Sequence, residues 1–330
     1  MMRFGVEFVP EEPVEKIVNL ASLADSLDFD NVWITDHYNN RSVYIVLSKI
    51  AEKTSQITLG PGVTNPYTVN PAETASTIAT LDNISDGRAV LGIGPGDKTT
   101  LNSLGIEWDK PLTRTKEAIE VIERLLAGEE VQCEQMDKHD MKRAKLNFEF
   151  KGDIPIYIGA QGPNMLKMAG ENGDGVLVNA SHPKDFHFAI DRIEEGIEEA
   201  NRSIEDVDIT AYTSFSVAEE TEKAKKAVLP PVAFIVASVN EKILERHGIS
   251  FEKAEEIQKH LDGGDYGEAF ASVTDDMVDA FALYGTPEEC VRKIKELEDS
   301  GVTQLVSGSP IGPNKEEAIR MISEEIIPSF

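Results

Sequence analysis

The sequence predicts a (β/α)8 TIM barrel in one domain that covers residues 1–330. Short apolar runs rich in β-branched residues alternate with runs of helical period, and eight strand-like runs are each separated from the next by a crossover. No composition break or flexible linker divides the chain, which favours one domain. A doubly wound parallel sheet would show a similar alternation and is the competing fold.

The expected elements follow one another along the chain. Strands are predicted at residues 3–9, 31–35, 57–63, 88–93, 154–158, 175–179, 207–216 and 302–306. Helices are predicted at residues 13–26, 43–53, 71–81, 114–126, 164–171 and 184–200, and from Asn314 onward. The first helix has apolar residues at helical spacing, and Pro13 stands in its first turn, where proline is tolerated.

Two segments interrupt the alternation. Residues 131–151 are polar and poorly periodic, so we expect an excursion there, with a short hairpin as one form. Residues 218–283 form an insertion after the seventh strand, with several helix-like pieces and a turn at Gly263 and Gly264. Residues 286–289 (Thr-Pro-Glu-Glu) then open a helix with the capping-box pattern.

The composition excludes several classes of protein. The chain has 59 acidic and 32 basic residues and a net charge of −27, a field that repels nucleic acid and anionic membranes. It has no run of eighteen apolar residues and no signal-peptide pattern at its start. Cys133 and Cys290 are far apart, which is consistent with a reducing cytoplasm. The histidines are scattered without metal-ligand spacing, so no metal site is expected.

Polar residues and glycines follow the expected strands, and active sites of such barrels lie at these carboxyl ends. They are Glu7 and residues 35–40, 60–66, 94–97, 159–163, 179–181 and 307–310. The run at residues 92–97 could indicate a dinucleotide fingerprint. Asp97 stands where that motif needs glycine, however, and Pro95 removes a backbone donor, and both features argue against a dinucleotide site.

Single residues at these ends allow two interpretations each. Glu7 could be a general acid with a raised pKa or one half of a buried ion pair. Asp36 could cap the next helix, and His37 could be a structural hydrogen-bonding residue. Asp97 could cap a loop.

Longer motifs carry a resemblance to a known family. Residues 81–88, running into residues 91–94, resemble the most characteristic signature of the luciferase-like superfamily of flavin and deazaflavin barrels, and residues 114–128 resemble its next helix. Within this superfamily the chain is similar to the 5,10-methylenetetrahydromethanopterin reductase family of methanogenic archaea and their relatives. The matching segments are residues 33–40, 59–67, 92–97, 159–163, 174–181, 244–248 and 307–314. Residues 131–151 show no close correspondence.

The resemblance implies an enzyme of one-carbon metabolism and methanogenesis. It would transfer a hydride reversibly from reduced coenzyme F420, an 8-hydroxy-5-deazaflavin, to 5,10-methylenetetrahydromethanopterin, giving the 5-methyl form. Glu7 would be catalytic and contact the substrate, where it stabilises a developing cation or protonates the departing nitrogen. The protein would be a cytoplasmic homodimer or homotetramer with a small pterin as its substrate.

The resemblance also assigns roles to the strand ends. Asp36 and His37 would lie along the deazaflavin edge, and Gly62–Val63 would be a non-prolyl cis peptide behind the ring. Backbone N–H groups of Gly162, Ala180 and Ser181 would bind the phosphate of the cofactor tail. The remaining expected cofactor contacts are Thr64, Gly94, Gly96, Ala160 and Asn179, and the expected substrate contacts besides Glu7 are Asp97, Gln161, Phe215, Ser216 and Phe234.

Other functions compete with this one. Another F420-dependent barrel oxidoreductase would act on a secondary alcohol or a sugar phosphate, and a flavin-dependent monooxygenase is more remote. A non-catalytic cofactor-binding relative would have no need for an acid at the hydride site, so Glu7, Asp97 and Gln161 argue against it.

Overall fold

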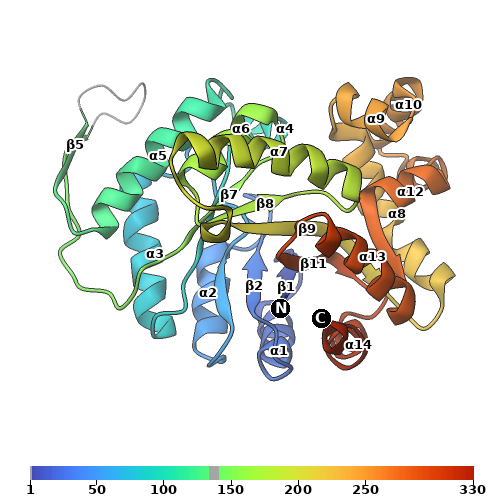
Figure 1. The fold of residues 1–330 in the computed structure, drawn as a ribbon, viewed down its shortest axis with the longest axis horizontal. Helices are drawn as coiled ribbons and strands as arrows, with labels where there is room; N and C mark the ends of the chain where they lie inside the picture. Colours follow the sequence, from blue (N-terminus) through green and yellow to red (C-terminus); the bar gives the residue numbers. More distant parts are fainter. Residues whose placement is uncertain (1, 134–140) are drawn as a thin grey trace. The chain divides into compact units, whose positions relative to one another are not determined.

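The structure, a computed structural model, describes residues 2–133 and 141–330 (Figure 1). The chain forms two compact units. The first, here called the N-terminal unit, comprises Glu7–Leu177 and Asp191–Ile209. The second, here called the C-terminal unit, comprises Met1–Val6, Val178–Ile190 and Thr210–Phe330.

The N-terminal unit repeats strand and helix in regular alternation. Its elements are the end of β1 (Arg3–Phe8), α1 (Val14–Asp25), β2 (Asn31–Ile34), α2 (Val43–Ala51), β3 (Thr58–Pro61), α3 (Pro71–Ser85), β4 (Leu91–Ile93), α4 (Lys98–Ser103), α5 (Pro111–Leu126), β5 (Val131–Cys133), β6 (Met141–Ala144), β7 (Ile156–Gly159), α6 (Pro163–Asn172), β8 (Gly175–Val178) and the second half of α7 (Pro183–Glu199). Parallel pairs join β2 to β3, β4 to β7 and β7 to β8, and isolated bridges link β3 to β4.

The C-terminal unit pairs the first residues of β1 with β11 (Gln304–Ile311), β11 with β9 (Asp208–Val217), and β9 with β10 (Ala282–Gly285), all in parallel. The insertion supplies α8 (Thr221–Ser238), α9 (Glu241–His247), α10 (Phe251–Asp262), α11 (Tyr266–Ala271) and α12 (Asp275–Phe281). These helices share an apolar core of their own, with Val232, Ile257 and Met277 fully buried. The unit ends with α13 (Pro287–Asp299) and α14 (Lys315–Met321), which continues as η2 (Ile322–Ile326) and η3 (Ile327–Ser329).

The strand order confirms the predicted (β/α)8 barrel. Within the described residues, the parallel strands run in the hydrogen-bonded order β3-β2-β1-β11-β9-β8-β7-β4. Once the hairpin and β10 are set aside, neighbours in this order are consecutive along the chain, except that the first strand, β1, pairs with the last, β11. The bridges Leu59–Ala89 and Thr64–Ile93 join the two end strands of the order. A doubly wound sheet has two open edges and a reversal of strand order, so the competing fold is excluded.

Several predicted boundaries need correction. The sequence reading missed α4, which has only six residues and lies inside a polar loop. It also ended α3 four residues early, because the polar residues after Leu81 weaken the helical pattern. The excursion is a hairpin in which β5 and β6 pair antiparallel, and its residues 134–140 lie outside the described ranges. The predicted capping box is confirmed, since Thr286 and Glu289 exchange hydrogen bonds at the start of α13.

Residues 81–88, the segment that resembles the superfamily signature, hold the scaffold together. The guanidinium of Arg88 donates to the backbone oxygens of Ala51, Thr54 and Ile57 at 2.7–3.1 Å, and its Nε donates to that of Ser85 at 2.8 Å. These carbonyls belong to the end of α2, to the end of α3 and to the segment that enters β3 at its amino end. Arg88 therefore stabilises the amino end of β3, whereas the candidate site lies at the carboxyl end.

The neighbouring signature residue Asp82 is 1% exposed. Its Oδ2 accepts hydrogen bonds from the backbone N–H groups of Lys151 and Gly152 at 3.0 and 3.1 Å. Asp82 thereby anchors the chain where it returns from the hairpin. Among the helices of residues 2–133 and 141–330, none combines the length and apolar character that crossing a membrane requires.

Candidate functional site

Hydrogen bonds hold the carboxyl ends of three strands of the N-terminal unit side by side. The backbone N–H of Thr35 donates to the oxygen of Phe8 at 3.2 Å, and that of Gly62 donates to the oxygen of Ile34 at 2.9 Å. Glu7 stands next to this junction near the end of β1 and is 6% exposed. The structure thus places the predicted acid in a buried position at the predicted end of its strand.

The Gly62–Val63 peptide bond, which the family resemblance implies to be cis, is cis in the structure. The Val63 side chain packs where β4 and β7 have glycines. A Cβ atom on Gly94 would lie 2.9 Å from Val63 Cγ2, and one on Gly159 would lie 3.3 Å from both methyl groups. Gly92 is more constrained, since its Cβ would lie 2.2 Å from the oxygen of Pro61. Glycine at these positions lets the end of β3 approach its neighbours.

Thr64 and Asp36 connect the ends of β2, β3 and β4. The backbone of Thr64 accepts from Gly94 and donates to Gly92 at 2.9 Å each, and its hydroxyl donates to Asp36 Oδ2 at 2.8 Å. Burial raises the pKa of Asp36 above its ordinary value, although the Thr64 hydrogen bond opposes this shift. The Asp36 side chain therefore keeps its proton to a higher pH than a free aspartate does.

The hydroxyl of Tyr44 in α2 is buried near Asp36, without a hydrogen-bond partner among the described residues. Burial raises the pKa of its phenol, and the negative charge of Asp36 raises it further. The cap of α2 is Ser42, so the interpretation of Asp36 as the cap of the next helix is wrong. Asp36 instead connects neighbouring strand ends through Thr64.

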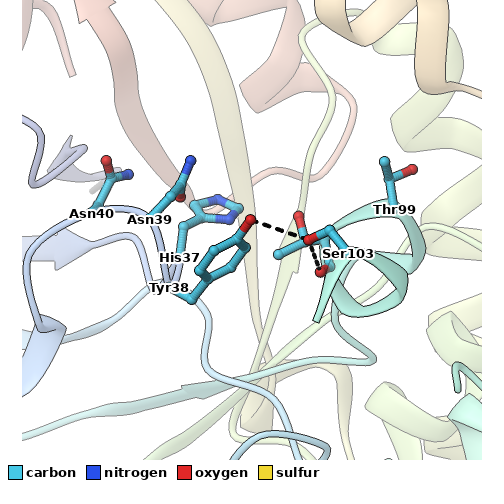
Figure 2. A pocket seen from close by; sticks show the side chains of 7 residues that line it. His37, Tyr38, Asn39, Asn40, Thr99 and Ser103 are labelled. Atoms are coloured by element: carbon cyan, nitrogen blue, oxygen red, sulfur yellow. Dashed lines mark hydrogen bonds between the residues drawn. The ribbon is translucent and has the colours of Figure 1, made fainter. Parts of the chain in front are cut away.

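A polar cavity of about 380 Å³ opens beside these strand ends (Figure 2). On one side lies the loop after β2 and on the other lies α4, and Figure 2 shows the Tyr38 ring reaching across to Ser103. Their hydroxyl oxygens are hydrogen-bonded at 3.2 Å. The lining residues carry imidazole, hydroxyl and amide groups: His37, Tyr38, Asn39, Asn40, Thr99, Thr100 and Ser103.

Asp97 caps α4, because its Oδ1 accepts from the backbone N–H of Thr100 at 2.6 Å. This is the structural alternative that the sequence left open, and the expected contact of Asp97 with substrate stays a prediction. The preceding loop is held by Trp108, whose Nε1 donates to the oxygen of Pro95 at 2.8 Å. Sequence reasoning missed Trp108 and Ser103, since both fall between predicted elements and carry no periodic signal.

The end of β7 carries three predicted site residues. The N–H of Ala160 donates to the oxygen of Leu177 in β8 at 3.1 Å, and Gln161 is exposed. Gly162 is the N-cap of α6, and apart from Gly162 itself and its two chain neighbours no described heavy atom lies within 4 Å of the position that a Cβ would take. The N-terminus of this helix is therefore open above Gly162, which suits the approach of an anion to its N–H groups.

The expected tail contacts Asn179, Ala180 and Ser181 lie in the C-terminal unit between β8 and α7. Asn179 is exposed, whereas Ser181 is buried and its hydroxyl donates to the oxygen of Phe281 in α12 at 3.1 Å. The turn at residues 179–181 is thus attached to the last helix of the insertion.

The expected pterin contacts of the C-terminal unit lie in different environments. Phe215 and Ser216 of β9 are fully buried, and the Ser216 hydroxyl has no hydrogen-bond partner among the residues that the structure describes. Phe234 of α8 is 51% exposed, and its ring lies 6.5 Å from that of Tyr266 in α11. Their substrate roles stay predictions.

Residues 2–304 match the model of the luciferase-like monooxygenase family. The chain is 53% identical to a 5,10-methylenetetrahydromethanopterin reductase of Methanolobus tindarius, over 99% of this chain and 100% of that protein. It superposes with a TM-score of 0.95 on the coenzyme F420 dependent tetrahydromethanopterin reductase of Methanopyrus kandleri, at 46% identity over 100% and 99% of the two chains. An F420-dependent glucose-6-phosphate dehydrogenase of Amycolatopsis mediterranei is more distant, at 27% identity over 98% of this chain and 96% of that protein.

Proposed function

Because this chain belongs to the luciferase-like monooxygenase family and, within it, to the 5,10-methylenetetrahydromethanopterin reductases, we propose that it reduces 5,10-methylenetetrahydromethanopterin with a hydride from reduced coenzyme F420. The product is the 5-methyl pterin, and the reaction is reversible. The burial of Glu7 at the end of β1 is the structural observation that carries the proposal.

The strand ends of the N-terminal unit fit a flat tricyclic cofactor. Glycines at 92, 94 and 159 remove side chains from the ends of β4 and β7, and Val63 fills the space behind them. The open start of α6 at Gly162 suits an anionic group. Asp36 and His37 would hold the ring edge, and residues 179–181 would hold the tail, as the family resemblance implies.

Coenzyme F420 supplies hydride only, so the protein has no need to control oxygen or single electrons. The tasks left to this chain are to orient the pterin, to stabilise positive charge as its bridging ring opens, and to deliver a proton to the departing nitrogen. Each of these tasks needs a polar group that lies beside the pterin and whose charge is not screened by water.

Glu7 can perform the last two tasks. As an anion it would stabilise the iminium cation of the substrate, because a buried site screens charge less than water does. As an acid it would protonate the departing nitrogen through its carboxyl oxygen. Asp97 and Gln161 would position the pterin beside it.

The assay mixes the protein with reduced F420 and methylenetetrahydromethanopterin under anaerobic conditions with added salt, and follows the return of deazaflavin absorbance. Glu7→Gln keeps the shape of the side chain but removes its acidity, so we expect turnover to fall by about 100-fold or more. The affinity for oxidised F420 should change little. Glu11→Gln, a change at an exposed residue of the following loop, serves as the matched control.

Absence of oxidation by the wild-type protein would disprove the proposed reaction, and full turnover by Glu7→Gln would disprove the role of Glu7. The same assay with a secondary alcohol or glucose 6-phosphate in place of the pterin tests the alternative F420-dependent oxidoreductase. A homodimer or homotetramer in the cytoplasm also belongs to the proposal, and sedimentation at low and high salt tests the assembly, since salt screens the repulsion of a net charge of −27.

A further inference from the structure

A buried carboxylate of the C-terminal unit has no role in the reaction described above. Asp185 stands in the first turn of α7 and is 7% exposed. Its Oδ1 accepts a hydrogen bond from Arg246 Nη1 at 2.6 Å, and its Oδ2 lies 2.9 Å from His247 Nε2. Both partners come from α9, within the motif at residues 244–248 that the sequence singled out without a role.

The two partners of Asp185, Arg246 and His247, also contact aromatic rings. The guanidinium of Arg246 lies 4.4 Å from the ring centre of Phe188, one turn along α7 from Asp185. The His247 ring is 5.1 Å from that of His182 in an edge-on arrangement and 5.4 Å from that of Phe281. Helices α7, α9 and α12 therefore meet around one buried charge.

The same residues fix the turn at 179–181. Ser181 donates its hydroxyl to the backbone of Phe281, and the next residue, His182, contacts His247 with its ring. His182 Nδ1 also accepts from the N–H of Lys184 at 3.1 Å, which closes the turn into α7. The turn is thus held by α9 and α12 of the insertion.

The charge of Asp185 strengthens the attachment of α7 to α9. Burial alone would raise the pKa of Asp185, but the hydrogen bonds and charges of His247 and Arg246 outweigh it and hold this pKa below its ordinary value. Asp185 is therefore ionised at neutral pH, and its bonds to α9 are charge-assisted.

We propose that Asp185, Arg246 and His247 are positioning residues that hold the turn at 179–181 in the shape that binds the phosphate-bearing tail of the cofactor. The inference rests on the proposed function, because it takes F420 as the ligand. The insertion then acts on cofactor affinity through the turn, without touching the reacting carbons.

Two ligands separate this role from a purely structural one. F420 and a truncated deazaflavin that ends at its ribityl group, without phosphate, are titrated into the protein, and the deazaflavin fluorescence gives the dissociation constants. We expect Asp185→Asn to weaken F420 binding at least tenfold and to change binding of the truncated ligand less than twofold. Asp191→Asn, at an exposed position of the same helix, should change neither.

A second pair of variants covers the case in which Asp185→Asn does not fold. Glutamine can donate a hydrogen bond from the position of the His247 Nε2 atom, so His247→Gln should keep most of the F420 affinity while His247→Ala loses it. Equal losses for both ligands, or no loss for either, would overturn the inference. If the protein does not use F420 at all, the wild type binds neither deazaflavin, a result that differs from all of these. If only the reaction with the pterin fails, the wild type still binds F420, and the variants still test the turn.

Discussion

Asp36 in the N-terminal unit and Asp185 in the C-terminal unit are both shielded from solvent, but they have different hydrogen-bond partners. Asp36 accepts from the hydroxyl of Thr64, and burial raises its pKa. Asp185 accepts from a guanidinium and contacts an imidazole, and its pKa is lowered. One carboxyl group is therefore pushed toward its neutral form, and the other is held as an anion.

The difference separates two uses of a buried carboxyl group. A group held as an anion by cations fixes helices, because breaking such a pair leaves a buried charge without compensation. A group whose ionised form is disfavoured is poised to exchange a proton, and such groups gather at functional sites. The contrast fits a reacting region at the strand ends around Asp36 and a supporting region around Asp185.

The largest expected effect tests the supporting region. Asp185→Asn leaves Arg246 without its charged partner, so the free energy of unfolding should fall by about 3 kcal/mol at neutral pH. The contribution of a carboxyl group with a lowered pKa is present above its ordinary value of 3.8 and is lost as the pH falls below that value. Urea unfolding between pH 3 and 7 should therefore show the difference from wild type shrinking at the acid end. A difference that stays constant over this range would contradict the ion pair.

A smaller effect of opposite sign is expected at Asp36. Its raised pKa means that it stabilises the fold at low pH and that this contribution is lost as the pH rises through the folded value, above 3.8. Asp36→Asn keeps an acceptor for Thr64 but cannot ionise, so it should stabilise the protein by about 1 kcal/mol at pH 7. Urea unfolding at pH 4 and pH 7 measures this gain, which should be smaller at pH 4. A loss of stability at pH 7 would show that the charge of Asp36 is satisfied, and the contrast with Asp185 would then fail.

The smallest effect concerns the rim of the cavity. Tyr38 is 58% exposed, and its hydroxyl bonds to that of Ser103. Tyr38→Phe removes this bond in a solvated position, so the free energy of unfolding should change by about 0.5 kcal/mol or less. Thermal unfolding of Tyr38→Phe beside wild type measures it. A change as large as that of Asp185→Asn would mean that the rim, too, supports the fold.

The sequence predicted the barrel well because its evidence is local. Each strand is an apolar run that can be recognised from its own residues. The residues that follow the strands all lie at the same end of a barrel, so Glu7 and Asp36 could be assigned to one region. The bond between Asp36 and Thr64 spans 28 residues, and the one between Asp185 and Arg246 spans 61, so no periodicity reports them. Helix α4 was missed for a different reason, because it has only six residues inside a polar loop. The hydrogen bond from Trp108 to Pro95 joins two loop residues, which carry no periodic signal.

Arg88 and Asp82 show what a family signature records. Both are committed to backbone atoms that close the scaffold, on the amino side of β3 and at the return from the hairpin. Residues 36, 62–64 and 97 lie at the carboxyl ends of the strands, so exchanges there could change the substrate without disturbing the hydrogen bonds of Arg88 and Asp82 to the backbone. The segment that identifies the family of such a barrel therefore does not indicate its reaction. The substrate of a newly sequenced relative has to be inferred from the residues at the carboxyl ends of its strands.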